Sequence, residues 1–510
     1  MGIDHGARRL ARGMAVIIAA VCVLAAMPTD VGIAPAAGPM PSVADMTSWL
    51  GTSGIRVPAL SVGTNTVTLL WPTPVDSRGV DSQVVRDYRI YENGRFLAQS
   101  SANTHTPAYG YMHAFATDPS HAHAQPIAMH TYVVDALRPS ASYRFSVQAV
   151  SSTGSVFSVG TDVTVRTKAL SKVLDVSDFG AVGDGETLDT AAIQRAVDAC
   201  SSDCTVLLPH GRTFVSGPLH LHGNMTFDVE GTLLRSATVS DSATASGSSA
   251  VSRMASTIRT GEAGRSGEQE DKDAPLLSNV KRADHATDAN IRIVGTGIID
   301  GNGWRTEGLD RMGLPTYAKG DVSSVQDVGV LAAAEYRWAV DQRHMSSARA
   351  YAWRSNIASF QNVAGLYIGD GLTIDNPSQH VITVSHGRNV MVNRAVIDSY
   401  NANNGDGLDF TDGQDLTVVN SVFDTGDDAI ALNAGYGVSG TRAGATRRVW
   451  VFDDYFGHDH SALAVGSGTA AGIGQVLAED DVMVSGASAL RCKSSAGTGG
   501  MVDDVVLRDS

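Results

Sequence analysis

The sequence predicts an all-β protein in which a small β-sandwich precedes a parallel β-helix. The chain has 510 residues, enough for two or three domains, and its 53 glycines accompany many short Val-, Thr- and Ser-rich segments separated by turns. This composition favours short strands over helices. In the second half of the chain, apolar strand cores recur every 24 to 33 residues. A period of this length, without regular helices between the strands, is typical of a parallel β-helix.

The repeating strand cores begin near residue 290 and continue to the end of the chain. Their first residues, spaced by 24, 26, 33, 27 and 29 positions, are Leu366, Val390, Leu416, Val449, Val476 and Val505. An antiparallel sandwich would show hairpin spacing instead, and leucine-rich repeats would show a tighter leucine pattern. The last repeat stops without a polar cap, so we expect either missing C-terminal rungs or an exposed last rung.

Residues 56–168 form the smaller unit, in which alternating strands are separated by turns such as the hairpin signal Asn93-Gly94. The unit has the size of an immunoglobulin-like sandwich and resembles a fibronectin type III module. The residues expected in its core are Trp71, Tyr91, Leu137 and Tyr143. A polar segment between the strands carries four histidines, which we interpret as loop residues rather than a metal site: His113, His121, His123 and His130.

The N-terminus predicts export. Arg8, Arg9 and Arg12 precede an apolar run, and small residues follow it, so residues 1–37 are interpreted as a signal peptide. The apolar run is too short to span a bilayer comfortably. We therefore expect an extracellular or periplasmic protein without membrane attachment once the signal is removed.

The net charge indicates which classes of molecule the protein can bind, and the cysteine content indicates whether it forms a disulfide. A formal net charge of −15 argues against nucleic acid, whereas an acidic sugar remains compatible because a local basic patch can act against a mild global field. In an exported protein, Cys200 and Cys204 are expected to close a small disulfide loop, and Cys492 is left over as a packed thiol.

Residues 174–510 are assigned to the β-helix domain. Near its start, a helix capped by Asp189 has an apolar face that includes Ile193, Ala196 and Val197, and we expect it to cover the open hydrophobic end. Residues 236–272 are poor in aromatic residues and rich in Ser, Thr, Ala and Gly, so we expect a mobile insertion there.

The coil period also brings polar residues together. Neighbouring coils stack at about 4.8 Å, so residues one period apart lie side by side. We expect Thr425-Gly426 to bend the chain so that both carboxylates of Asp427-Asp428 reach the outer face. The residues predicted on successive rungs of that face are Asp406, Asp427, Asp428, His460, Arg491 and Lys493. Singly, each is also typical of a turn, a structural histidine or a solvated strand; together they predict a site that binds a carboxylated sugar and supplies an acid and a base.

These residues resemble the four motifs of the polygalacturonases of glycoside hydrolase family 28, which read NTD, (G/Q)DD, GHG and RIK. The matching segments are "NGD" at 404–406, "GDD" at 426–428, "HDHS" at 458–461 and "RCK" at 491–493. Further likeness extends over residues 175–510. The resemblance implies a right-handed parallel β-helix that needs no cofactor and no metal. A fibronectin-like module in front resembles the arrangement of bacterial exo-acting members.

The resemblance implies a role for each matched residue. Asp427 matches the general acid, and Asp406 and Asp428 match the pair that activates water with inversion of the anomeric carbon. The matched substrate-binding residues are His460, Arg491, Lys493 and Asn404, of which the two cations hold the galacturonate carboxylate. Crowded carboxylates raise one another's pKa, so one of them can stay protonated as an acid while the others ionise.

Two motifs depart from the family pattern. Gly405 replaces the Thr of NTD, and Asp459 and Ser461 replace the glycines around the histidine. We match His460 rather than His458 to that histidine, because "GS" follows His460 at the expected interval. Asp459 is expected to perturb His460 or to crowd the sugar, which would reduce activity.

The predicted function is hydrolysis of α-1,4 links in polygalacturonate (pectin), with inversion and from a chain end, by a monomer whose partner is polygalacturonate or its oligomers. One alternative is a β-helical pectate lyase, which would need a calcium-binding acidic cluster and a base for the C5 proton. A second alternative is a non-catalytic pectin-binding β-helix. Rhamnogalacturonan or xylogalacturonan hydrolysis is an alternative at the level of substrate.

Overall fold

The computed structural model describes residues 54–74, 85–121, 127, 129–239, 258–263, 269–272, 274–279, 287–495 and 499–510. The predicted signal peptide at 1–37 and His123 lie outside these residues, as does most of the insertion predicted at 236–272. Within that insertion, β15 (Ile258–Ala263) and β16 (Gln269–Lys272) pair antiparallel and take no part in the coils. No helix in the described ranges is both long and apolar enough to cross a bilayer.

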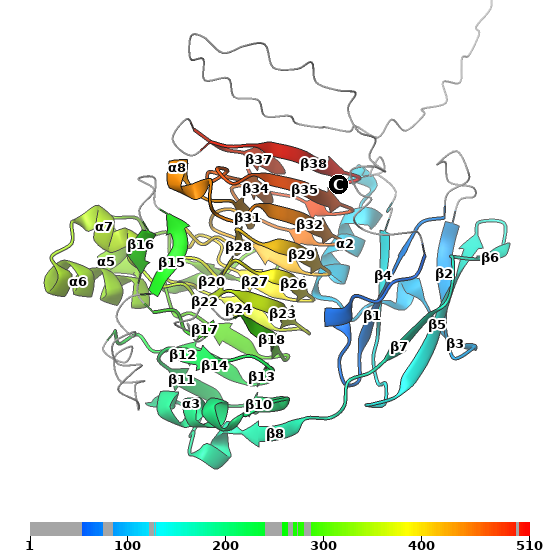
Figure 1. Ribbon diagram of the computed structural model, residues 1–510, viewed down its shortest axis with the longest axis horizontal. Helices are drawn as coiled ribbons and strands as arrows, with labels where there is room; N and C mark the ends of the chain where they lie inside the picture. The colour runs from blue at the N-terminus through cyan, green and yellow to red at the C-terminus, as the bar shows by residue number, and fades with distance from the viewer. Residues whose placement is uncertain are drawn as a thin grey trace, which may run out of the picture.

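The larger part of the molecule is a right-handed parallel β-helix built from three sheets that the chain visits in turn (Figure 1). In the described residues, sheet I contains β8 (Lys172–Asp175), β10 (Cys204–Leu208), β13 (Met225–Val229), β18 (Asp288–Val294), β23 (Val363–Gly369), β26 (Arg388–Asn393), β29 (Gln414–Val419), β32 (Thr446–Phe452), β35 (Ile473–Glu479) and β38 (Val502–Arg508).

The other two sheets complete each coil. Sheet II contains β9 (Asp184–Leu188), β11 (Thr213–Ser216), β14 (Thr232–Arg235), β19 (Ile298–Asp300), β24 (Thr373–Asp375), β27 (Val396–Asp398), β30 (Val422–Asp424), β33 (Tyr455–Phe456) and β36 (Val482–Met483). Sheet III contains β12 (Leu219–Leu221), β17 (Leu277–Asn279), β22 (Ala358–Gln361), β25 (Ile382–Ser385), β28 (Leu408–Thr411), β31 (Ile430–Asn433), β34 (Leu463–Val465) and β37 (Leu490–Cys492).

The register of sheet I confirms the predicted repeat residue by residue. Leu366 pairs with Val390, Val390 with Leu416, and the ladder continues through Val449 and Val476 to Val505. These side chains are buried in one core that runs through the stack. The apolar period therefore specifies which strands stack, because a slip in register would expose the core residues.

Aspartate and asparagine make the sharp turns from sheet I to sheet II. Asn420, Asp453 and Asp480 have φ of 57°, 58° and 59°, a left-handed conformation that these two residue types tolerate well. In the next position, Asp454 and Asp481 each accept a backbone N–H from the coil before, at 2.6 Å and 3.1 Å. The short polar residues between the strand cores thus satisfy turn amides that stacking would otherwise leave unpaired.

The start of the β-helix is closed by α3 (Thr190–Ala199), whose buried face includes Ile193, Ala196 and Val197, as predicted. Asp189 occupies the predicted N-cap position of α3, but its side chain makes no capping hydrogen bond. Its carboxylate accepts the backbone N–H groups of Val182 and Gly183 at 2.7 and 2.9 Å, and so holds the preceding turn instead of the helix amides.

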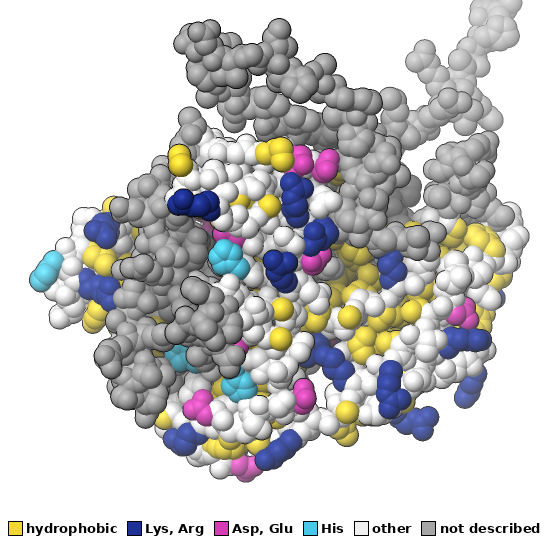
Figure 2. Space-filling view, in the orientation of Figure 1, with side chains coloured by type: hydrophobic (Ala, Val, Ile, Leu, Met, Phe, Trp, Pro, Cys, Tyr) yellow, Lys and Arg dark blue, Asp and Glu magenta, His cyan; other side chains and the backbone are white. Residues whose placement is uncertain are grey.

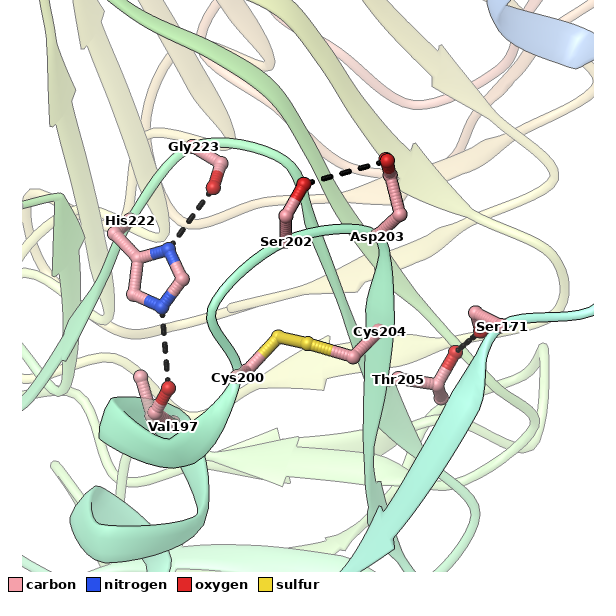
Figure 3. The surroundings of a disulfide bond; sticks show 9 residues. All are labelled: Ser171, Val197, Cys200, Ser202, Asp203, Cys204, Thr205, His222 and Gly223. Atoms are coloured by element: carbon pink, nitrogen blue, oxygen red, sulfur yellow. Dashed lines mark hydrogen bonds between the residues drawn. A yellow bond between two sulfur atoms is a disulfide. The ribbon is translucent and has the colours of Figure 1, made fainter.

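A disulfide joins the end of α3 to the first residue of β10 (Figure 3). It links Cys200 and Cys204, which confirms the prediction. Beside it, His222 contacts the carbonyl oxygens of Val197 and Gly223 at 3.1 and 2.9 Å. Cys492, outside the disulfide, is partly buried against the core.

The expectation that no regular helices interrupt the coils is wrong between β19 and β22. This segment holds β20 (Thr306–Leu309), β21 (Pro315–Tyr317), α5 (Val325–Val328), α6 (Leu331–Arg343) and α7 (Ser347–Ala352). The helices have an aromatic core of their own, and the buried carboxylate of Glu335 binds Ser355 and Ser378 of the adjoining coils. A further short helix, α8 (Gly437–Gly440), lies between β31 and β32.

The N-terminal unit is a sandwich of two sheets around one core. One sheet pairs β1 (Val67–Pro72) with β4 (Met129–Val134), and the other contains β2 (Val85–Glu92), β3 (Arg95–Gln99), β5 (Ser142–Ser151), β6 (Val156–Ser158) and β7 (Val163–Arg166). Asn93 and Gly94, with φ of 50° and 79°, form the predicted hairpin turn. Trp71, Leu137 and Tyr143 are in the core, but Tyr91 is not: it faces the other side of β2 and packs on Phe96.

Most of the predicted histidine loop has regular structure. His113 lies in α2 (Pro107–Thr117), and His121 ends a short 3₁₀ turn, η4 (Pro119–His121). His130 lies in β4, where it binds Tyr88 and Thr73, and burial lowers its pKa to about 4. Within the described ranges, the other 3₁₀ turns are η2 (Ala59–Ser61), η3 (Ser100–Ala102) and η5 (Val176–Phe179).

The sandwich packs against the outer face of sheet I (Figure 1). Leu70 and Met129 of the sandwich contact a row of apolar side chains that includes Met391 and Trp450. Thr131 donates its hydroxyl across the junction to Asn420 at 2.8 Å. In the space-filling view of Figure 2, basic and acidic side chains are interspersed over the visible coils and sandwich. Where the sandwich contacts it, sheet I is thus covered on both faces.

Candidate active site

The predicted site residues lie where the chain passes from sheet II to sheet III. Asp406 precedes β28, Asp427 and Asp428 precede β31, and His460 precedes β34. Backbone hydrogen bonds align these loops: Gly407 N–H donates to the carbonyl of Asp428 at 3.0 Å, and His460 N–H to that of Asp427 at 3.0 Å. Stacked loops therefore bring the predicted carboxylates and imidazole together on successive rungs.

Asp427 and Asp428 lie in a bend between β30 and β31 and not within a strand. A bend at this point of the chain is what the sequence predicts. A side chain on Gly426 would meet the carbonyl of Ala402 on the neighbouring loop, and one on Gly405 would meet Ser399. Glycine at these two positions therefore lets the loops stack closely. The same crowding explains why glycine replaces the Thr of the NTD motif at position 405. The hydroxyl of Ser399 fills the available space and donates to the Gly405 carbonyl at 2.6 Å.

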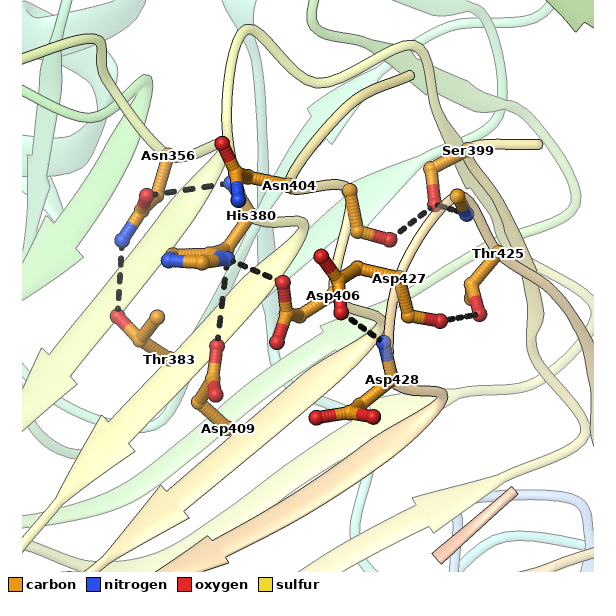
Figure 4. A network of polar contacts seen from close by, with 12 residues as sticks. Asn356, His380, Thr383, Ser399, Asn404, Asp406, Asp409, Thr425, Asp427 and Asp428 are labelled. Atoms are coloured by element: carbon orange, nitrogen blue, oxygen red, sulfur yellow. Dashed lines mark hydrogen bonds and ion pairs between the residues drawn. The ribbon is translucent and has the colours of Figure 1, made fainter. Parts of the chain in front are cut away.

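The three carboxylates form one compact cluster (Figure 4). Asp406, Asp427 and Asp428 each offer an oxygen, and the three oxygens lie within 4.8 Å of one another. Asp427 is the most exposed of them, with 20% of its side chain accessible, whereas Asp428 is buried at 1%. The pKa of Asp427 is raised, first by burial and next by the charge of Asp406, which favours a protonated carboxyl at this position.

An imidazole and an ammonium group contact this cluster from the C-terminal coils. His460 Nδ1 lies 3.0 Å from Asp427 Oδ1, with 54% of its side chain exposed. Lys493 Nζ binds Asp428 Oδ2. Burial alone would lower the pKa of Lys493, but the hydrogen bond to Asp428 and the charges of the three aspartates raise it, so the ammonium stays charged. Arg491 lies on β37, where it pairs in register with Ala464.

The third carboxylate has a partner that sequence reasoning missed. His380 Nδ1 lies 2.9 Å from Asp406 Oδ1 and 3.7 Å from Asp409 Oδ2. His380 precedes β25, one coil before Asp406, and its neighbour Val381 donates its N–H to the carbonyl of Asp406. The coil period alone could have indicated this residue, since His380 occupies the rung position equivalent to Asp406.

Asn404, predicted to bind substrate, lies beside the cluster, but its side chain is hydrogen-bonded to a buried arginine. Its side-chain oxygen accepts from Nη2 of the fully buried Arg354 at 3.1 Å. Arg354 also donates to the carbonyls of Ser378 and Asn403. The arginine therefore ties together the two loops that carry His380 and Asp406, a connection that the motifs did not indicate.

The two histidines of "HDHS" have different roles in the fold. His458 binds the buried Asp424 at 2.8 Å and stacks on Tyr400, whereas His460 reaches Asp427, in line with the match to His460. Asp459 is buried against Gly486, and Ser461 is fully buried. Burial, with the charges of Asp428 and Asp424, raises the pKa of Asp459 to about 7. The extra carboxyl thus lies below the surface that carries His460.

Three groups of side chains in the described residues have donor sets suited to a cation. They are Asp406, Asp427 and Asp428; His380, Asp406 and Asp409; and Asp310, Asp424 and His458. In the first group, Lys493 and His460 already compensate two of the carboxylates. The partly exposed carboxyl of Asp427, with its raised pKa, therefore lies beside Asp428 and Asp406, which Lys493 and His380 contact. Such an arrangement can donate a proton and accept another.

Comparison with known proteins agrees with the geometry. The model of glycosyl hydrolases family 28 matches residues 347–509, and the model described as rhamnogalacturonase A/epimerase, pectate lyase-like, matches residues 173–280. An exo-poly-alpha-D-galacturonosidase of Dickeya chrysanthemi is 36% identical over 89% of this chain and 74% of its own. The chain belongs to glycosyl hydrolase family 28. It is therefore a glycoside hydrolase.

A solved structure of a family 28 exopolygalacturonase from Yersinia enterocolitica superposes with a TM-score of 0.79. It is 33% identical, over 88% of this family 28 chain and 78% of the other. A probable polygalacturonase of Vitis vinifera is 25% identical over 65% of this chain and 59% of its own. The match to the Yersinia structure extends over most of the chain, in line with the β-helix described above.

Proposed function

We propose that this chain hydrolyses the α-1,4 links of polygalacturonate and removes products from a chain end. The observation that carries the proposal is the cluster of three carboxylates, with His460 on Asp427 and Lys493 on Asp428. Relatives named exo-poly-alpha-D-galacturonosidase and exopolygalacturonase, 36% and 33% identical over most of the chain, support both the substrate and the exo mode.

In the proposed reaction, Asp427 is the general acid. Its carboxyl is the most exposed of the three, and its raised pKa keeps the proton available for the glycosidic oxygen. The exposed ring of His460, 3.0 Å away, can hold that carboxyl in position and contact the sugar. Proton transfer to the leaving oxygen lets the glycosidic C–O bond break with both electrons going to oxygen.

We propose that Asp406 and Asp428 accept the proton of the attacking water. Lys493 contacts Asp428 directly, and Asp406 is held by His380. Enzymes that invert usually hold acid and base about 6.5–9.5 Å apart, to leave room for water. Here the carboxylate oxygens lie within 4.8 Å, so inversion is inferred from family resemblance rather than from spacing. Proton NMR of the first product anomer decides it: β-galacturonate supports inversion and α-galacturonate contradicts it.

Substrate binding is proposed for the cations and polar groups around the cluster. Arg491 lies on β37 and Lys493 directly follows that strand, at the end of sheet III. The two cations can hold a galacturonate carboxylate, which they bind better than a neutral sugar. His460 and Asn404 are proposed to contact sugar hydroxyls. The activity should accordingly fall when the carboxylates of the polymer are methyl-esterified.

The decisive experiment is product analysis on polygalacturonate with the wild type and Asp427→Asn. We expect the wild type to release mono- or digalacturonate early with slow loss of viscosity, and Asp427→Asn to lose about 10²–10⁴-fold in kcat. Asp162→Asn, which removes a carboxylate of the sandwich, is the matched control. Equal activity of the Asp427 variant would remove the acid assignment.

A calcium-dependent lyase is the second candidate, because the three carboxylates could also hold a cation. Lys493 on Asp428 argues against it, since an ammonium group occupies one of the ligands. Ultraviolet absorbance of unsaturated products, abolished by chelator, would establish the lyase. Binding of oligogalacturonate without new reducing ends would instead establish a non-catalytic β-helix.

We also propose that the chain is exported, by a signal in residues 1–37, to the periplasm or the medium and acts as a monomer. The charge pattern of the N-terminus supports export. We further propose that residues 56–168 are a fibronectin type III-like domain and residues 174–510 the catalytic domain. N-terminal sequencing of the exported protein checks the signal: a sequence that still begins at Met1 would exclude cleavage.

A further inference from the structure

His380 occupies the same rung position as two proposed catalytic carboxylates. The register of sheet III pairs Ile382 of β25 with Leu408 of β28, and Leu408 with Ile430 of β31. Counting two residues back along each strand gives His380, Asp406 and Asp428. An imidazole therefore lies in the same column of side chains as the carboxylates, one coil toward the N-terminus from Asp406.

The surroundings fix the ring of His380. Its side chain is 12% exposed, and its backbone N–H donates to Asn356 while its carbonyl accepts the N–H of Ile357. Nδ1 lies 2.9 Å from Asp406 Oδ1, and Asp409 on the same strand end approaches the same nitrogen at 3.7 Å (Figure 4). Asp427, whose pKa the charge of His380 tends to lower, is the other acidic group that faces it. Hydrogen bonds thus hold the backbone of His380, and two carboxylates contact Nδ1 of its ring.

We propose that His380 is a positioning residue that holds Asp406 in the orientation for activating water. Its Nδ1–H donates to Oδ1 of Asp406 and fixes the carboxylate plane, which leaves Oδ2 to take the proton of the attacking water. The water oxygen then bonds to the anomeric carbon, the glycosidic bond breaks, and the leaving oxygen takes its proton from Asp427. This inference rests on the proposed function.

The geometry favours this role over direct sugar binding. A ring that is mostly buried, and whose Nδ1 is engaged by two carboxylates, has little surface for substrate. Arg354 ties the loops of His380 and Asp406 together through the carbonyls of Ser378 and Asn403, so the spacing between the two side chains is braced from inside. Mutation of a residue that orients a functional side chain through a hydrogen bond typically lowers activity about 10–100-fold.

The test compares His380→Phe with His380→Asn. Phenylalanine keeps the ring volume but has no donor, whereas the amide nitrogen of asparagine can take the place of Nδ1. On polygalacturonate we expect His380→Phe to lower kcat about 10–100-fold with KM changed less than about threefold. His380→Asn should stay within about fivefold of the wild type. Thermal melting of all three proteins checks that the fold is retained.

A double-mutant cycle with Asp406→Asn separates the possible outcomes. If His380 acts through Asp406, His380→Phe should lower kcat by less than about threefold further in the Asp406→Asn background. Equal losses for the Phe and Asn variants, additive losses, or a rise in KM at constant kcat would each overturn the proposal. A wild type that melts normally but releases no reducing ends would overturn the proposed function as well, which distinguishes the two failures. If His380→Phe does not fold, His380→Leu replaces it in the same cycle.

Discussion

Arg491 and Lys493 lie two positions apart but differ in their surroundings, and this difference is testable. Lys493 contacts the buried Asp428, whereas Arg491 is half-buried on β37. Lys493→Met should therefore lower kcat by about 10²-fold or more and also raise KM, because it leaves a buried carboxylate uncompensated. Arg491→Met should mainly raise KM, by about tenfold. Steady-state kinetics on oligogalacturonates separates the two, and the same kcat for both variants would contradict the distinction.

At the level of single residues, the sequence predicted those that both the coil period and the motifs mark, and missed those outside the four motifs. Asp406, Asp427 and His460 follow from period and motif, and the structure brings them together. His380 lies outside the four motifs, and Arg354 follows a helical insertion that interrupts the period. Local patterns also failed where tertiary contacts compete, as they do for Asp189 and Tyr91. The coil period predicts on which coil a residue lies, but the contacts of its side chain depend on loops of unequal length.

One element-scale feature is a column of aspartates, three buried and Asp300 half-buried, at the ends of four sheet II strands. Asp300, Asp375, Asp398 and Asp424 pair in register through β19, β24, β27 and β30. Burial, then the neighbouring carboxylates Asp375 and Asp424, raises the pKa of Asp398 to about 9. Burial also raises the pKa of Asp424 to about 6, and those of Asp300 and Asp375 are raised too. The folded protein therefore binds protons here that the unfolded chain releases.

This column predicts that stability falls as pH rises. An aspartate with a raised folded pKa stabilises the fold fully below its unfolded pKa of about 3.9, and that contribution is lost as pH rises toward the folded value. For Asp398 the loss amounts to at most about 1.4 kcal/mol per pH unit between about pH 4 and 9. Asp398→Asn mimics the protonated acid, so its melting temperature should gain on the wild type between pH 5 and 8.

The measurement is thermal melting of wild type and Asp398→Asn at several pH values. Asp415→Asn is the control, since that carboxylate is 46% exposed and pairs with Arg448 at the surface. A difference between wild type and Asp398→Asn that does not change with pH would mean that Asp398 is already ionised in the fold.

At the scale of the whole molecule, the strand cores of sheet I carry a signal beyond the period. In the cores that begin at Leu366, Val390 and Val449, the flanking residues face the interior, and the middle residues Tyr367, Met391 and Trp450 face outward. A continuous apolar run is typical of a strand covered on both faces. The sequence thus held the information that something covers sheet I, but which domain covers it depends on contacts between distant segments and could not be read from the runs.

Leu70 provides the test of this packing. Leu69 and Trp71 of β1 point into the sandwich, whereas Leu70, fully buried, points to the outer face of sheet I. Leu70→Glu would bury a charge between the two domains, which costs several kcal/mol unless the contact opens. Opening of this contact would expose the apolar side chains on the outer face of sheet I, which include Met391 and Trp450. The variant should therefore melt at lower temperature and aggregate.

Calorimetry and size-exclusion chromatography of the full chain measure both effects, with Phe96→Glu as the matched control on the same sandwich. Phe96 is 57% exposed on β3, away from the junction, so the control should stay within about 0.5 kcal/mol of the wild type. If the two domains stabilise each other, Leu70→Glu should also split one unfolding transition into two, because the sandwich then unfolds without the β-helix. Identical melting of Leu70→Glu and Phe96→Glu would mean that the junction contributes no stability, and that sheet I needs no cover to remain folded.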